Sequence, residues 1–194
     1  MRTRFKLVIA LATLLASPLA AAVDCHGDPT SETLAWYERF CSRLTDTWKR
    51  GGHSLLLSGY SWHTPWTYTK EKRDELESDS WGGGYGRVVY DEKGDEHMVY
   101  GLAFQDSHRN AQIQVGYLWT RYWGTEGGLQ GGLGYTLMIV QRPDIWNGIP
   151  FPAALPIASI RYDRAVVTMT YIPTVNGGVN NGSVLYVMGR YNFK

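Results

Sequence analysis

The stretch AQIQVGYLWTRYW, residues 111–123, alternates regularly between two kinds of side chain. In an extended backbone, one face carries Ile113, Val115, Tyr117 and Trp119, and the other carries Gln112, Gln114, Gly116 and Leu118. This period of two predicts a β-strand whose two faces meet different surroundings. A length of about ten residues is what a tilted strand needs to cross a bilayer. The stretch therefore favours the wall of a membrane β-barrel.

Seven further segments of similar length surround this one, separated by polar or turn-forming residues. The eight predicted strands cover residues 53–68, 81–91, 96–105, 111–123, 128–141, 148–161, 164–172 and 183–193. Tight turns at residues 91–94 and at Asp163 alternate with longer polar connections at residues 69–80, 142–147 and 174–182. Short periplasmic turns and long external loops are typical of an even-stranded outer-membrane barrel. We therefore predict an all-β fold, an eight-stranded antiparallel outer-membrane β-barrel over residues 53–194.

An N-terminal amphipathic α-helix is predicted before the barrel, within residues 23–52. Over residues 33–48 the apolar side chains recur at steps of three and four, and they are Leu34, Trp36, Tyr37, Phe40, Leu44 and Trp48. Such spacing indicates one apolar helical face. Its Trp and Tyr residues suit a helix lying in a membrane interface, although a helix packed on a soluble core would show the same pattern.

The first 22 residues have the order of a secretory signal peptide. Arg2, Arg4 and Lys6 precede an apolar run at residues 7–15, and small residues follow as far as Ala22. Export to an oxidising compartment allows a disulfide between Cys25 and Cys41, but the sequence leaves their pairing open. A lipidated Cys25 is a weaker alternative because Asp24 precedes it.

Composition excludes several function classes. The net charge of +1 gives no electrostatic reason to bind nucleic acid. Beyond the leader, the sequence holds no run of about 20 apolar residues that would predict a spanning helix. The 22 Gly, 13 Tyr and 8 Trp residues instead favour short strands and aromatic girdles. No pattern predicts a metal site, a nucleotide site or any other cofactor.

Three residues predicted to lie at the outer rim of the barrel suit acyl-transfer chemistry. They are His63, Asp106 and Ser107, the last two adjacent after a strand. A hydroxyl needs a base to take its proton, and an imidazole needs an acid to hold its tautomer. The residue types alone are weak evidence, since an Asp-Ser pair after a strand is often a turn.

The sequence resembles the PagP family of lipid A palmitoyltransferases in seven short segments. They are Trp62-His63, YTKEK at residues 68–72, WGGGYG at 81–86, DEKG at 91–94, AFQDS at 103–107, LPIAS at 155–159 and MTYIP at 169–173. Their order covers nearly all of the chain after the leader. The resemblance implies an outer-membrane enzyme that moves a palmitoyl chain from the sn-1 position of a phospholipid donor to the hydroxyacyl chain of a lipid A acceptor.

The resemblance also implies roles for particular residues. The family's catalytic His, Asp and Ser fall on His63, Asp106 and Ser107, with His63 as general base and acid and Ser107 assisting or attacking. Lys72 matches a basic loop position that could meet the lipid A phosphates, or it is a solvated loop charge. His97, expected at the inner end, and His108 are not placed in the site.

Two departures from the family bear on the acyl chain. Leu118 stands where the family has a Gly at the floor of its acyl pocket, so we predict an acyl chain shorter than palmitoyl. Prolines that would open gaps between strands are replaced by Ser58, Ser80 and Arg164, while Pro150, Pro152 and Pro156 remain. Lateral access is therefore expected near the sixth strand.

Competing interpretations remain at this stage. A pore is disfavoured because eight strands enclose no wide channel. A non-catalytic outer-membrane barrel for binding or adhesion would share the fold but not the chemistry. The sequence does not distinguish a monomer from a homodimer, nor does it identify the acylated position or a phosphatidylglycerol acceptor.

Overall fold

The computed structural model describes residues 25, 27–33, 35–175 and 180–193. The predicted signal peptide, residues 1–22, lies outside the described residues. Among the helices that are described, none is long and apolar enough to cross a membrane. The chain divides after Arg50 into two compact units.

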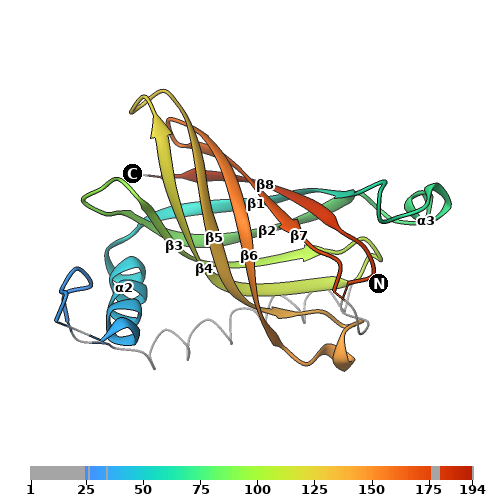
Figure 1. Ribbon diagram of the computed structural model, residues 1–194, viewed down its shortest axis with the longest axis horizontal. Helices are drawn as coiled ribbons and strands as arrows, with labels where there is room; N and C mark the ends of the chain where they lie inside the picture. Colours follow the sequence, from blue (N-terminus) through green and yellow to red (C-terminus); the bar gives the residue numbers. More distant parts are fainter. Residues whose placement is uncertain (1–24, 26, 34, 176–179, 194) are drawn as a thin grey trace. The chain divides into compact units, whose positions relative to one another are not determined.

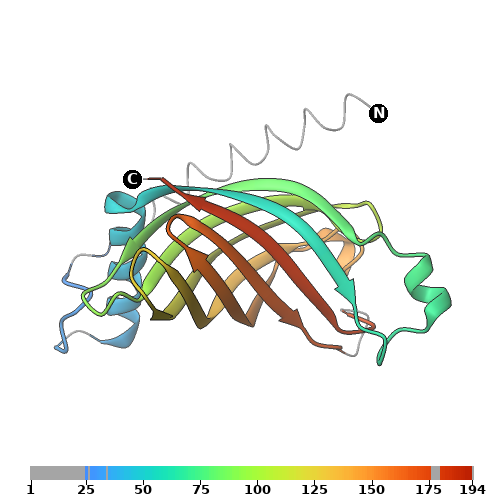
Figure 2. The ribbon, with the colours of Figure 1, turned by 90° about the horizontal axis from the view of Figure 1, so that it is seen from above.

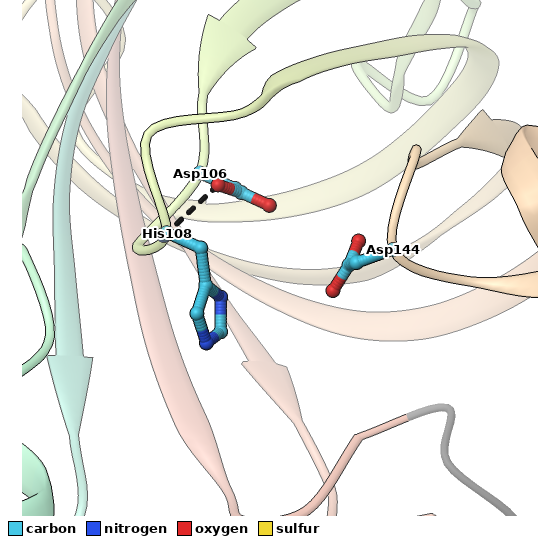
Figure 3. A group of neighbouring side chains, drawn as sticks. All are labelled: Asp106, His108 and Asp144. Carbon is cyan, nitrogen blue, oxygen red and sulfur yellow. Dashed lines mark hydrogen bonds between the residues drawn. The ribbon is translucent and has the colours of Figure 1, made fainter.

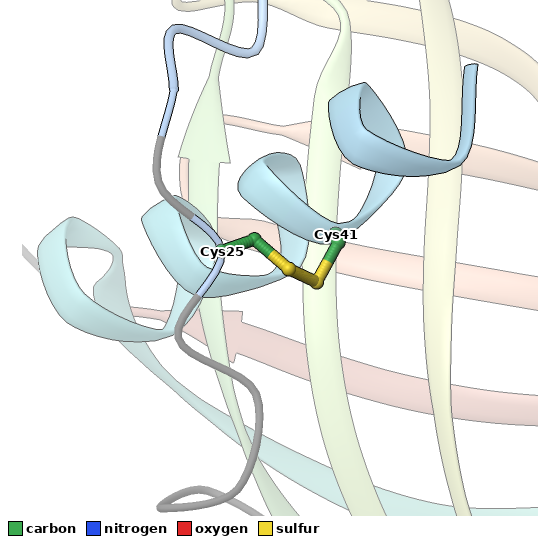
Figure 4. The surroundings of a disulfide bond; sticks show 2 residues. All are labelled: Cys25 and Cys41. Atoms are coloured by element: carbon green, nitrogen blue, oxygen red, sulfur yellow. A yellow bond between two sulfur atoms is a disulfide. The ribbon is translucent and has the colours of Figure 1, made fainter. Parts of the chain in front are cut away.

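The N-terminal unit contains the predicted helix, α2, at Trp36–Arg50. Glu38 accepts a hydrogen bond from the backbone N–H of Ala35 at 3.1 Å, and Lys49 and Arg50 lie in the last turn, where they complement the helix dipole. Cys25 and Cys41, whose pairing the sequence left open, form a disulfide that ties the segment before the helix to its second turn (Figure 4). The interfacial location of this helix stays a prediction.

The second unit is a closed antiparallel barrel in which each strand pairs with its sequence neighbours and β8 pairs with β1 (Figures 1 and 2). The strands are β1 Gly52–His63, β2 Asp79–Tyr90, β3 Glu96–Gln105, β4 Ala111–Gly124, β5 Leu129–Gln141, β6 Phe151–Tyr162, β7 Ala165–Ile172 and β8 Val184–Asn192. The predicted eight-stranded antiparallel barrel is confirmed.

Two ends of the barrel differ in their connections. At one end, here called the loop end, lie the connections β1–β2, β3–β4, β5–β6 and β7–β8; the turn end carries β2–β3, β4–β5 and β6–β7. A short helix, α3 at Lys70–Asp74, extends from the loop end, with the Thr69 hydroxyl accepting from the Lys72 amide (Figure 1). The predicted first strand was too long because the chain turns at Thr64, whose carbonyl accepts from the amides of Thr67 and Tyr68.

The predicted two faces of β4 are also confirmed. Gln114, Leu118 and Thr120 are buried inside the barrel, whereas Val115 and Trp123 are exposed on the outer wall. The inward side chains of several strands form one apolar cluster, made of Leu56, Val88, Met98, Tyr100, Leu102, Leu118, Ile157, Tyr186 and Met188.

A β-bulge in β1 changes which residues face inward. Ser58 is buried, Gly59 and Tyr60 are both exposed, and Ser61 and His63 are then buried, because the pairing with β8 shifts between Ser58 and Tyr60. A side chain at position 59 would lie 3.1 Å from a β8 carbonyl oxygen, which favours the glycine found there. Bulges of this kind re-aim side chains next to functional sites. If the same residues followed a strict alternation with no bulge, His63 would point out of the barrel.

A buried charged pair lies in the barrel interior between the apolar cluster and the turn end. Arg190 donates to Glu96 at 2.8 Å, and both side chains are fully buried. Tyr90 donates to the same carboxylate at 3.1 Å, and Arg190 also donates to Thr168 at 3.2 Å. The barrel interior therefore holds an apolar cluster in its middle and a charged pair nearer the turn end.

We expect Arg190→Met to lower the free energy of unfolding by about 3–5 kcal/mol, because it leaves the Glu96 carboxylate buried without its partner. Urea unfolding in detergent micelles measures the loss. Lys70→Met is the control, since Lys70 pairs with Asp74 at 3.0 Å with both side chains exposed, and such a pair contributes at most about 1 kcal/mol. Equal losses in both variants would contradict this prediction.

Candidate active site

His63 and Ser107 meet at the loop end of the barrel. The Ser107 Oγ lies 2.9 Å from the Nε2 of His63, although the residues are 44 positions apart in sequence. His63 is the last residue of β1, and Ser107 belongs to the turn between β3 and β4. A serine hydroxyl in contact with an imidazole nitrogen is the arrangement that activates a hydroxyl for attack on an ester. The structure thus brings two of the three predicted residues together.

Asp106, the third predicted residue, is bonded to its own turn. Its Oδ1 accepts a hydrogen bond from the backbone N–H of His108 at 2.9 Å (Figure 3). It accepts a second from the backbone N–H of Asn110 at 2.7 Å. Its own amide donates to the Asn110 carbonyl at 2.8 Å. Because the serine lies inside this loop, the Asp106 carboxylate holds the backbone that presents Ser107. It does not take the place of the aspartate that bonds the histidine in a serine-protease triad.

Arg142, a residue that the sequence did not single out, lies beside Asp106. The Asp106 Oδ2 is buried without a hydrogen-bond partner, and the Arg142 guanidinium is 3.9 Å away. Arg142 is itself held by Asp144, to which it donates two hydrogen bonds of 3.1 and 2.7 Å. Burial acts to raise the pKa of Asp144, but the hydrogen bonds and charge of Arg142, together with a backbone hydrogen bond and the charge of His108, lower that pKa below its ordinary value.

Three side chains in this region could in principle ligate a metal. The carboxylates of Asp106 and Asp144 and the imidazole of His108 have ligand atoms within 4.8 Å of one another (Figure 3). Arg142 already supplies a positive charge to both carboxylates. The geometry is that of an ion-pair cluster, and we assign no metal to it.

The His63 ring is fixed by aromatic packing. Tyr68 meets it edge to face, with ring centroids 5.3 Å apart, and burial raises the pKa of the Tyr68 phenol. The Tyr68 ring fills the space that a side chain at Gly182 would need. Thr64, directly after His63, bonds the Ser183 hydroxyl at 2.7 Å. The connections β1–β2 and β7–β8 together therefore hold the imidazole in place.

The two predicted substrate-binding residues lie apart from this pair. Lys72 is on α3, where its ammonium pairs with Glu75 at 2.9 Å and remains about half exposed. Leu118 is fully buried in the apolar cluster, opposite Met98 on the neighbouring strand. His97, left out of the site, lies near the turn end, bonded to the Tyr117 hydroxyl at 2.5 Å and to Asp91 at 3.2 Å.

The fold and the Ser–His contact define a class of protein, a membrane-type β-barrel with a serine hydroxyl in contact with a histidine at one mouth. Residues 43–190 match the family described as antimicrobial peptide resistance and lipid A acylation protein PagP. The chain belongs to this family, and it is an acyltransferase acting on lipid A.

Individual relatives agree over almost their whole length. The lipid A acyltransferase PagP of Methylobacillus flagellatus is 38% identical, covering 96% of this chain and 97% of that protein. The proteins of the same name from Bordetella bronchiseptica and Legionella pneumophila strain Paris are 38% and 36% identical, each over 95% of this chain and 97% of their own. The PagP family is an outer-membrane one, and a closed barrel fits that location.

We expect Asp106→Asn to retain more acyltransferase activity than Asp106→Ala. An amide oxygen can still accept the hydrogen bonds from His108 and Asn110, whereas alanine leaves both amides without that acceptor, at a cost of about 1–3 kcal/mol. Initial rates of acyl transfer to lipid A, compared at equal amounts of folded barrel, provide the measurement. Asparagine as inactive as alanine would show that the charge of Asp106, and not its acceptor oxygen, is what matters.

Proposed function

We propose that this chain moves a palmitoyl or shorter acyl chain from the sn-1 position of a phospholipid to the hydroxyacyl chain of lipid A in the outer membrane. The observation that carries the proposal is the contact between Ser107 Oγ and His63 Nε2 at the mouth of an apolar interior. A binding or adhesion barrel would have no need of a hydroxyl paired with an imidazole. The family membership favours the enzyme over that alternative.

His63 would move the proton and Ser107 would act on the ester carbonyl. The imidazole Nε2 takes a hydroxyl proton as the new bond to the acyl carbon forms, and it returns a proton to the departing lysophospholipid oxygen. If Ser107 attacks first, an acyl-enzyme forms and the lipid A hydroxyl then displaces it; if the lipid A hydroxyl attacks directly, Ser107 positions it. In both routes His63 Nε2 takes the proton of the attacking hydroxyl and returns a proton to the leaving oxygen.

The apolar cluster would hold the acyl chain. Leu118 and Met98 lie opposite each other on neighbouring strands, both fully buried, and they separate the apolar middle of the barrel from the Arg190–Glu96 pair. A fully buried Leu side chain occupies space that glycine would leave open. Together with the charged pair beneath, it supports a shallow pocket and hence a preference for shorter chains.

Lateral access would lie between β6 and β7. Ile157–Tyr162 of β6 pairs with β7, whereas residues 151–156 pair with β5 and have no partner in the described part of β7. Pro152 and Pro156 in this half carry no N–H to leave unsatisfied. Between β1 and β2, where the family's prolines are replaced by Ser58 and Ser80, the strands are joined, since Ser61 and Ser80 form a hydrogen bond of 2.7 Å. The sixth strand thus remains the better route for a lipid chain.

Lys72 is proposed to meet a phosphate of lipid A. Its ammonium is exposed at the loop end, and its present partner is the exposed carboxylate of Glu75, the residue that caps the end of α3. An exposed pair of this kind contributes about 0–1 kcal/mol, so exchange of Glu75 for a phosphate costs little.

We expect lipid A from cells that express the chain to carry one additional acyl chain, and the Ser107→Ala and His63→Ala variants to lose it while the barrel still folds. Mass spectrometry of lipid A reads the result, and the shift of the heated band on a gel verifies folding. An unchanged lipid A profile with the folded wild-type protein present would exclude the proposed reaction.

We expect Leu118→Gly to shift acyl-donor preference toward longer chains, because it removes the side chain at the pocket floor, and to cost about 2–5 kcal/mol of stability. Donors of graded chain length, compared in one competition assay, measure the shift. Leu137→Gly is the control, since Leu137 lies beside this position on β5 but faces outward and is 38% exposed. If both variants keep the wild-type preference for acyl-chain length, Leu118 does not set the depth of the acyl pocket.

A further inference from the structure

A polar cavity of about 230 Å³ lies at the loop end, on the outer face of the barrel wall. It is lined by Glu77, Asp79, Trp81, Gln105 and Arg109. Asp79 and Trp81 are exposed, while Ser80 between them is buried in the interior, so the cavity is separate from the acyl pocket. At this level an outward-facing side chain meets the headgroups of the outer leaflet, not its hydrocarbon.

The cavity is built onto the turn that carries the candidate catalytic serine. Gln105 and Arg109 flank that turn, and the Gln105 amide donates to the Arg109 carbonyl at 3.2 Å. The Glu77 amide donates to the Ser107 carbonyl at 3.1 Å, and the Glu77 carboxylate is held by the Arg109 guanidinium. A group bound in the cavity therefore lies beside the backbone of Ser107.

The lining matches the chemistry of a sugar ring. The exposed indole of Trp81 offers a flat apolar face to ring C–H groups. The carboxylates of Asp79 and Glu77 accept hydrogen bonds from hydroxyl or amide groups, and the Gln105 amide both donates and accepts. The cavity has two carboxylates, those of Glu77 and Asp79, and one guanidinium, that of Arg109, which already pairs with Glu77. This excess of negative charge disfavours the binding of a phosphate.

We propose that this cavity binds a sugar ring of the lipid A headgroup and so positions the acceptor beside Ser107. The proposal rests on lipid A as acceptor and, for its kinetic test, on the transfer reaction described above. It differs from a girdle role for Trp81, because an aromatic anchor at the membrane interface requires no polar cavity next to its ring.

The kinetic test compares Trp81→Ala and Asp79→Asn with the control Trp123→Ala. Trp123 is an exposed tryptophan on the outer wall of β4 near the turn end, and it does not line the cavity. We expect Trp81→Ala and Asp79→Asn each to raise the KM for lipid A by about tenfold. Hydrolysis of the phospholipid donor by water should stay at the wild-type rate in all three variants. An unchanged KM, or a parallel fall of hydrolysis and transfer, would overturn the proposal.

A binding test separates this proposal from the transfer reaction. The Ser107→Ala protein in detergent micelles is titrated with an acyl-free, unphosphorylated glucosamine disaccharide, and binding is followed by calorimetry. Binding that is lost when Trp81→Ala is added supports the sugar site even if no acyl transfer is ever observed. Equal affinity in both proteins, or binding of inorganic phosphate in preference to the disaccharide, refutes it.

Discussion

The pairing of β1 with β8 is the constraint on which the rest of the molecule depends. Within a membrane, an unpaired backbone N–H or C=O costs several kcal/mol, so a sheet is stable there only when it closes on itself. Closure joins Ser54–His63 of β1 to Val184–Asn192 of β8. It also encloses an interior in which inward side chains pack against one another. Among the described side chains, the apolar cluster and the Arg190–Glu96 pair each fill part of this interior.

The site follows from one irregularity in that closure. A strict period of two would place Tyr60 and Trp62 inside the barrel and His63 outside. The bulge at Gly59 and Tyr60 adds one residue to β1 relative to β8, and the imidazole then faces inward beneath the loops. Ser107 reaches it from a turn held by Asp106, whose carboxylate bonds backbone amides. The histidine is therefore positioned by the bulge in the β1–β8 pairing, and the serine by the hydrogen bonds within its own turn.

Much of the barrel could be predicted from the sequence because strand alternation and turn residues are local signals. The segment around Leu118 shows both faces of the wall without any knowledge of its neighbours. The bulge could not be predicted, because the register of β1 depends on its partner strand and a single glycine at position 59 does not indicate a bulge. Arg142 and the cavity beside Trp81 were missed for a related reason: their contacts join separate connections of the loop end, and an Arg or a Trp in a polar segment has no pattern of its own. His63 and Ser107 were selected as candidate site residues from their chemistry and from the family resemblance. That their side chains are in contact could be known only from the fold.

In the proposed reaction, the two-part interior would also determine how far an acyl chain can reach. On the loop-end side of Leu118 and Met98, an acyl chain would lie among the side chains of the apolar cluster, and each methylene that enters would gain about 0.8 kcal/mol of transfer free energy. Below them a chain would meet the fully buried Arg190 and Glu96 side chains, whose mutual hydrogen bond it would have to break. Separating two buried charges costs several kcal/mol, which exceeds the transfer free energy gained by burying a few methylenes. On the proposed function, Leu118 would therefore set the depth of the acyl pocket within the apolar part, and the charged pair would fix a limit that no change at Leu118 alone removes.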